Sequence, residues 1–323
     1  MKRSHLIAAL VVFVLSLLAP AVVQTDYVLQ VLFRIYLFAA LGLAWNLVGG
    51  YAGQLSLGHA AYFGAGAYGL ALFSGRLGVS PWIAVLIGVA VALGCALLIG
   101  GVSFRLRGPY FVLATIAFAE VLRLVAKNLP NVTGGDVGVQ VPALFHGNVS
   151  RTFYWAAVVL TALAFATTVA ISRARFGYYL MAIREDEDTA LSVGIGAAGN
   201  KLAALLVSAA LTALSGALYA SLFLYVVPDQ VLSIDVSNEI AIVAMLGGAG
   251  TVLGPVVGSV VLESASEIFK NVFKEAHLLI YGMLLVVVVL FLPEGIVGTI
   301  SASLRRRAMF GGIKASAKGV TGD

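Results

Sequence analysis

Charged side chains are scarce in this sequence. Asp, Glu, Lys and Arg make up 11% of its 323 residues, whereas soluble domains carry about 25%. The mean hydropathy is correspondingly high, at +1.02. So little charge excludes a soluble globular domain and indicates an integral membrane protein.

Residues that catalyse reactions or bind metals are also few. The single cysteine, Cys95, lies in an apolar window and has no partner for a disulfide or a Cys-ligated metal site. The four histidines have no paired His, Cys or carboxylate at ligand spacing, and no Walker-type GxxxxGK[ST] is found. We therefore expect that this chain is not an enzyme and binds no metal and no cofactor.

Long apolar windows fill the sequence instead, since 61% of the residues are hydrophobic. Crossing a hydrocarbon core of about 30 Å takes about 20 apolar residues in a helix. The alternating ten-residue segments of a β-barrel do not occur, and lipid offers the backbone no hydrogen-bond partners. The sequence thus predicts an all-α fold, a polytopic membrane helical bundle of about ten transmembrane helices in which some segments are broken or re-entrant.

The predicted spans are 6–25, 31–49, 54–74, 80–102, 108–127, 152–172, 201–227, 232–247, 251–268 and 277–297. The first could instead be a cleaved signal peptide, although it is longer than the usual hydrophobic region of one. The span 232–247 is short and carries Asp235 and Glu239, so it could be broken or re-entrant.

Most of the 20 Lys and Arg residues fall on one side of this arrangement, which predicts cytoplasmic termini by the positive-inside rule. We expect residues 1–304 to form a single transmembrane domain. It would have a cytoplasmic loop at 173–200 and an external loop at 128–151. A basic cytoplasmic tail, 305–323, would follow and rest on the lipid bilayer.

Two glycine-rich segments resemble each other. "LVGGYAGQLSLG" begins at Leu47 and "MLGGAGTVLG" at Met245, with a length difference of two residues. Both fall at the inner end of a descending span, as in a parallel repeat. Chance similarity between glycine-rich membrane sequences explains the pair equally well.

Polar residues inside predicted spans are candidates for function. Gln54, Ser56, His59 and Tyr62 could line a solute pathway, although the small residues around them also favour tight helix packing. Glu120 and Arg123 are one helical turn apart and could form an intramembrane ion pair. Glu263 and Glu267, followed by lysines, are typical of a solvated helix end, and an ion site is the alternative.

The stretch from Tyr178 to Val193 carries one Arg and four consecutive acids, Arg184 to Asp188. Apolar residues recur on one side of a helical projection, which predicts a short amphipathic helix at the membrane surface. A solvated acidic loop is the alternative.

The chain as a whole resembles the permease family of branched-chain amino-acid ABC importers, and specifically the second, larger membrane subunit of the high-affinity importer. The resemblance covers about Tyr36 to Gly298. The segments that carry it, in family order, are "NLVGGYAGQLSLGHAAYFGAGAY", "LRGPYFVLATIAFAEVLR", "NVTGGDVGV", "FGYYLMAIREDEDTALSVGI" and "AMLGGAGTVLGPVVGSVVLE". Within the fourth, "DTALSVG" is similar to the EAA-type loop that docks into the ATPase, although Asp and Thr replace its Glu and first Ala.

This resemblance implies a pore subunit that moves Leu, Ile or Val, delivered by a periplasmic binding protein, across the bacterial inner membrane. The implied partners are a homologous second permease and two cytoplasmic ATP-binding subunits, which use the ATP. No nucleic acid is expected. The resemblance makes Arg184, Glu187, Asp188 and Gly194 the contacts of the ATPase-coupling loop.

Three other interpretations stay open from the sequence. Urea and short-chain amide importers use very similar permeases, so the solute could differ. An ion-coupled secondary transporter would use Glu120, Asp235 or Glu239 to carry its ion or proton. A membrane scaffold without transport would tolerate changes along the spans.

Overall fold

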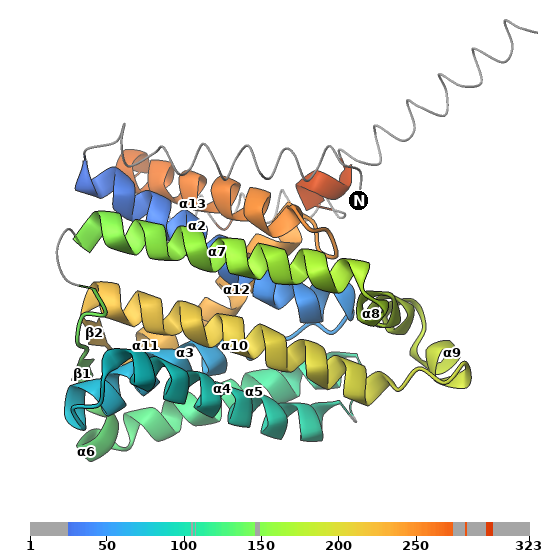
Figure 1. Ribbon diagram of the computed structural model, residues 1–323, viewed down its shortest axis with the longest axis horizontal. Coiled ribbons are helices and arrows are strands. Elements are labelled where there is room, and N and C mark those ends of the chain that lie inside the picture. Colours follow the sequence, from blue (N-terminus) through green and yellow to red (C-terminus); the bar gives the residue numbers. More distant parts are fainter. Residues whose placement is uncertain are drawn as a thin grey trace, which may run out of the picture.

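The computed structural model describes residues 25–104, 106, 108–145, 149–273, 282 and 295–299. Figure 1 shows the long helices lying side by side, with α8 and α9 at one end of the bundle and α6 at the other. We call these the α9 end and the α6 end. The arrangement confirms the predicted all-α bundle.

The helices in the described part are α2 (Asp26–Asn46), α3 (His59–Leu70), α4 (Pro81–Ser103), α5 (Pro109–Lys127), α6 (Pro130–Thr133), α7 (Val149–Arg173), α8 (Arg175–Glu185), α9 (Glu187–Ser192), α10 (Ala197–Phe223), α11 (Pro228–Val231), α12 (Ile234–Gly247) and α13 (Gly254–Phe273). Wider π-helical turns extend α2 over Leu47–Tyr51 and α3 over Ala71–Arg76. Two short strands, β1 (Val139–Gln140) and β2 (Tyr225–Val226), pair antiparallel at the α6 end, with Val139 opposite Val226.

The predicted spans from 31–49 to 251–268 each coincide with a helix to within a few residues. Six helices of the described part are long and apolar enough to cross a membrane, which makes this a multi-pass membrane protein. The predicted spans 6–25 and 277–297 and the tail 305–323 lie wholly or largely outside the described residues. The count of ten therefore stays a prediction.

Two predicted spans are interrupted. In the span 54–74 the backbone is non-helical from Gly53 to Gly58, and α3 begins only at His59. The predicted span 232–247 is the second part of a broken helix, because α11 ends at Val231 and α12 begins at Ile234. Broken helices near the membrane interior free backbone groups for other contacts.

Proline fixes where several helices begin. Pro81 and Pro109 occupy the first turn of α4 and α5. This position suits proline, because its fixed φ is helical and the N–H that it lacks would have no partner within the helix.

The centre of the bundle is α3, in which His59 to Gly64 and Gly66 to Leu70 are all buried. It packs mainly against α10 and α4. The contact with α10 depends on two glycines. A Cβ placed on Gly66 would lie 1.9 Å from the Ala213 carbonyl oxygen, and one on Gly216 would lie 2.0 Å from that of Phe63. Lipid gives little hydrophobic drive for helix association, so such close backbone contact supplies much of it.

We predict that Gly66→Ala lowers the free energy of unfolding by about 1–3 kcal/mol, because a backbone carbonyl cannot move aside as a flexible side chain can. Thermal unfolding of the purified protein in detergent measures the change. The matched control is Gly94→Ala on α4, where an added Cβ would meet nothing within 4 Å. Equal destabilisation by the two variants would show that the α3–α10 contact is not tight.

Candidate functional site

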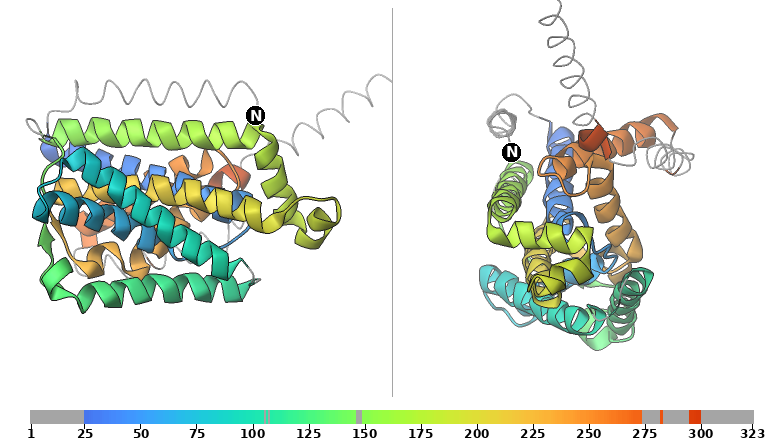
Figure 2. Two further views of the ribbon diagram at one scale, coloured as in Figure 1. Left: turned by 60° about the horizontal axis from the view of Figure 1, so that its bottom comes forward. Right: turned by 90° about the vertical axis from the view of Figure 1, so that its right-hand side faces the viewer.

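The helices α8 and α9 form a compact pair that extends past the long helices at the α9 end (Figure 2). They replace the single amphipathic helix predicted from Tyr178 to Val193. The prediction was wrong at Asp186, whose backbone is extended (φ −159°, ψ 114°) and whose side chain accepts a hydrogen bond from the Thr189 N–H. An Asp in this conformation ends one helix and caps the next.

A small apolar core and one ion pair hold the two helices together. Ile183 of α8, Ala190 of α9 and Ala197 of α10 bury their side chains against one another. Lys201 Nζ lies 2.7 Å from Glu187 Oε2, and the Lys201 side chain is only 2% exposed. Such a buried pair is costly to break, because one charge would be left without its partner. Glu187 therefore fastens the pair to the start of α10.

Exposed side chains in and just after the pair include apolar and acidic residues. Tyr178, Leu191 and Val193 are exposed, Val193 to 71%, and Asp188 is also exposed. After α9 the chain turns back at Gly194, whose φ is +86°. This left-handed conformation strains residues other than glycine.

Arg184, at the end of α8, points back toward the transmembrane helices. Its Nη1 donates to the Gly50 carbonyl oxygen at 2.6 Å, across 134 residues of sequence. Its side chain also packs on Gly53, and its Nη1 lies beside Gly250.

The two glycine-rich segments that resemble each other in sequence are in direct contact. Asn46 Nδ2 donates to the Thr251 carbonyl oxygen at 2.8 Å, and Asn46 Oδ1 accepts from the Gly250 N–H at 2.7 Å. One buried side-chain amide at the end of α2 thus satisfies two backbone groups of the α12–α13 loop. We define the glycine seam as Leu47 to Gly53 together with Gly248 to Thr251.

The predicted pathway residues fall into two environments. Gln54 lines an open cavity of about 420 Å³ between the seam and the start of α5, where Gly108, Phe111 and Leu113 also contribute. In contrast, Ser56, His59 and Tyr62 are fully buried. The structure therefore does not bring all four to one open surface, and their role in a pathway stays a prediction.

The polar interior around His59 is nevertheless well defined. His59 Nε2 lies 2.9 Å from Ser208 Oγ of α10, and the Ala60 N–H donates to Ser237 Oγ of α12 at 2.8 Å. Trp45 Nε1 donates to the Ser56 carbonyl oxygen at 2.7 Å. Within the described residues, His59 Nδ1 and the Tyr62 hydroxyl have no hydrogen-bond partner. These contacts join α3 to α10 and α12 where α3 begins.

An ion cluster within the bundle joins three helices, and the sequence analysis did not predict the pairing. Arg34 of α2 lies 3.3 Å from Glu263 of α13 and 4.0 Å from Glu239 of α12. The expectation of a solvated end at Glu263 was wrong, because its side chain is 4% exposed. A lone Arg in the apolar run of α2 was the available signal, but the partner lay too far along the chain to be assigned.

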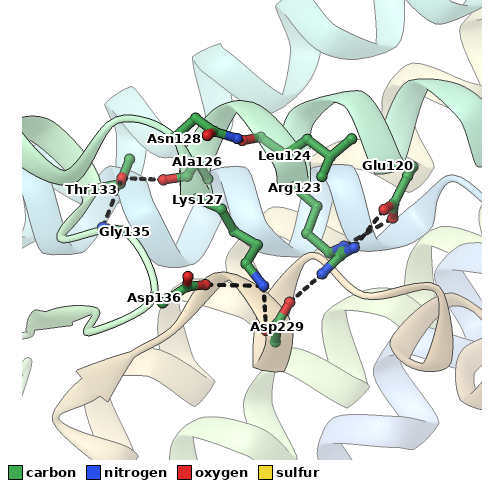
Figure 3. A network of polar contacts seen from close by, with 10 residues as sticks. All are labelled: Glu120, Arg123, Leu124, Ala126, Lys127, Asn128, Thr133, Gly135, Asp136 and Asp229. Atoms are coloured by element: carbon green, nitrogen blue, oxygen red, sulfur yellow. Dashed lines mark hydrogen bonds and ion pairs between the residues drawn. The ribbon is translucent and has the colours of Figure 1, made fainter.

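A second network lies at the α6 end (Figure 3). Arg123 Nε donates to Glu120 Oε2 at 2.9 Å, so these two residues form an ion pair, and Arg123 also binds Asp229 of α11. Lys127 lies 2.9 Å from both Asp229 and Asp136. The network ties α5 to α11 and to the loop before β1. Glu120 is 40% exposed, so its pairing is only partly shielded and contributes modestly to stability.

The described part is thus a multi-pass membrane bundle with a helix pair projecting from one end and ionisable residues paired inside it. Comparison with known families makes this specific. Residues 27–289 match the family described as "Branched-chain amino acid transport system / permease component". The chain therefore belongs to this permease family.

Individual relatives agree with the family match. The permease protein LivM of the high-affinity branched-chain amino acid transport system of Escherichia coli K12 is 28% identical over 288 residues, 80% of this chain and 67% of the relative. LivH, a permease protein of the same system, is 25% identical over 283 residues, 81% of this chain and 91% of the relative. A probable LivM of Methanocaldococcus jannaschii is 22% identical over 212 residues, 60% of this chain and 61% of the relative. No solved structure matches the chain.

We predict that Arg34→Leu destabilises the bundle, because the buried Glu263 carboxylate loses its cation. The melting temperature in detergent should fall by several degrees, and Arg34→Leu/Glu263→Leu should recover most of the loss. Arg34→Lys, which keeps a positive charge, is the matched control. Its melting temperature should fall less than that of Arg34→Leu. A double variant as unstable as the Arg34→Leu single variant would contradict the pairing.

Proposed function

We propose that this chain is the pore-forming permease subunit of an ATP-driven importer that moves Leu, Ile or Val inward across the bacterial inner membrane. The single observation that carries the proposal is the family match over residues 27–289. The chain itself would bind no nucleotide, and ATP would be hydrolysed by two separate cytoplasmic subunits. A periplasmic binding protein would deliver the amino acid.

The proposed partner within the membrane is a second, homologous permease. Support comes from the matches to LivM and to LivH, both permease proteins of one transport system in Escherichia coli. A C2-like pair of similar subunits would place a solute pathway between them. In this arrangement the cavity beside Gln54 would form part of the inner mouth.

The proposed orientation puts the α9 end in the cytoplasm and the α6 end outside. The projecting pair α8–α9, within the loop 173–200, would then dock on an ATPase. Its exposed apolar residues Tyr178, Leu191 and Val193 suit burial in a groove of a partner, and the exposed Asp188 suits a basic side chain at the rim. Gly194 would hold the turn that presents this face.

We predict that Val193→Asp and Asp188→Lys abolish co-purification of an ATPase from native membranes in mild detergent. The measurement is the ATP hydrolysis activity and the subunit composition recovered with the tagged chain. Val137→Asp is the matched control, because Val137 is an equally exposed valine, at 77%, close to the α6 end. The control should keep the ATPase.

The cargo needs its own measurement. Proteoliposomes that hold the complete complex should take up labelled leucine upon addition of ATP and binding protein, and an excess of valine, but not of urea, should compete. Competition by urea or a short-chain amide instead would change the solute while keeping the mechanism.

An ion-coupled secondary transporter is the second candidate, favoured by the intramembrane cluster of Arg34, Glu239 and Glu263. It predicts uptake by this chain alone, driven by an ion gradient without ATP. Such uptake, together with recovery of no ATPase by the wild-type chain, would replace the importer with this candidate.

A further inference from the structure

Arg184 connects the helix pair α8–α9 to the transmembrane helices through its contact with the glycine seam. We call this contact the joint. The guanidinium reaches the Gly50 carbonyl oxygen at 2.6 Å. This oxygen belongs to the π-helical turn that ends α2, and the last carbonyl groups of a helix have no partner within it and can accept from other donors. A hydrogen bond from a charged donor is stronger than one between neutral groups.

The seam forms a slot that fits the arginine side chain. A Cβ on Gly53 would lie 2.8 Å from Arg184 Cγ, and one on Gly250 would lie 2.4 Å from Arg184 Nη1. Both glycines also have positive φ, +67° and +81°. Residues other than glycine would therefore be strained at both positions by the backbone conformation, and at Gly53 they would also meet the stem of the Arg184 side chain.

The two sides of the slot lead to different helices. Gly53 begins the non-helical stretch that continues past Gln54 to the start of α3, and Gly250 lies in the loop between α12 and α13. Asn46 connects the two sides through the Gly250 N–H and the Thr251 carbonyl oxygen. The two segments are therefore linked to each other, and Gly53 and Gln54 also line the cavity.

Arg184 moves with the helix pair on its other side. The preceding residue, Ile183, is buried against Ala190 and Ala197, so α8 and α9 carry the arginine as one body. The ion pair of Glu187 with Lys201 fastens this body to the adjacent α10. Arg184 is different, because it connects the same body to segments 134 residues away in sequence.

We propose that Arg184 is a positioning residue that transmits movement of the α8–α9 pair to the glycine seam, and through it to α3 and the α12–α13 loop. Its guanidinium serves the inside of this subunit, while the outer face of the pair serves the ATPase. The inference rests on the proposed function. Breaking the joint should leave an importer that assembles and hydrolyses ATP but does not transport.

The test compares Arg184→Met, Arg184→Lys and Glu185→Gln in the complete complex. Glu185 is the exposed neighbour of Arg184 and provides the matched control. Arg184→Met should retain the ATPase and most of its hydrolysis, while leucine uptake falls about tenfold or more, as the loss of a hydrogen bond to a charged group allows. Arg184→Lys should recover part of the uptake, because its ammonium can still donate to Gly50, and Glu185→Gln should behave as wild type.

A second variant tests the slot without altering the helix pair. Gly250→Ala should also reduce uptake while the ATPase stays bound. The double variant Arg184→Met/Gly250→Ala should lose less uptake than the sum of the two single losses, because both changes disturb the same contact. Additive losses would mean that the two residues act separately and would overturn the joint.

The remaining outcomes are distinct. Loss of the ATPase by Arg184→Met would make Arg184 a docking residue and overturn the inference while preserving the proposed function. If Arg184→Met lowers ATP hydrolysis and uptake by the same factor and also lowers the melting temperature, Arg184 has a structural role only. Normal uptake by Arg184→Met would exclude any role in transmission. Absence of an ATPase from the wild-type preparation would refute the proposed function itself.

Discussion

The fold depends on backbone contact around α3. Other helices surround α3, and their backbones can approach it closely only where the side chains on both helices are small. Gly66 and Gly216 provide that space at the crossing with α10, each facing a carbonyl oxygen of the other helix. A larger side chain at either position would separate the helices and loosen the central packing. The positions of the polar residues at the start of α3 follow from this contact.

Polar contacts hold the bundle together at both of its ends. At the α6 end, side chains bind side chains, since Arg123 and Lys127 both pair with Asp229. At the α9 end, Arg184 and Asn46 bind backbone groups of the glycine seam, in addition to the ion pair of Glu187 with Lys201. Exposed ion pairs contribute modestly to stability. A hydrogen bond from the charged Arg184 guanidinium to a backbone carbonyl is stronger than one between neutral groups.

The sequence predicted the helical bundle because uncharged windows and helix-starting prolines are local signals. It also identified the stretch around Arg184, since its charges stood out from an apolar chain. It could not predict the break at Asp186, where one cap overrides a helical pattern, or the burial of Glu263 beside Arg34. Those features depend on which distant segments meet. The contact of Asn46 with Thr251 spans 205 residues, and no local pattern of residue types encodes it.

Asn46 contacts only main-chain groups of the loop that it holds. Every residue offers a carbonyl oxygen and, proline excepted, an N–H. The loop can therefore change its side chains over evolutionary time and still be bound, provided that its path is kept. The asparagine has less freedom, because only Gln carries the same amide donor and acceptor, and its side chain is one methylene longer. We therefore expect the two glycine-rich segments to diverge in sequence and length during evolution, while the asparagine that connects them stays the same.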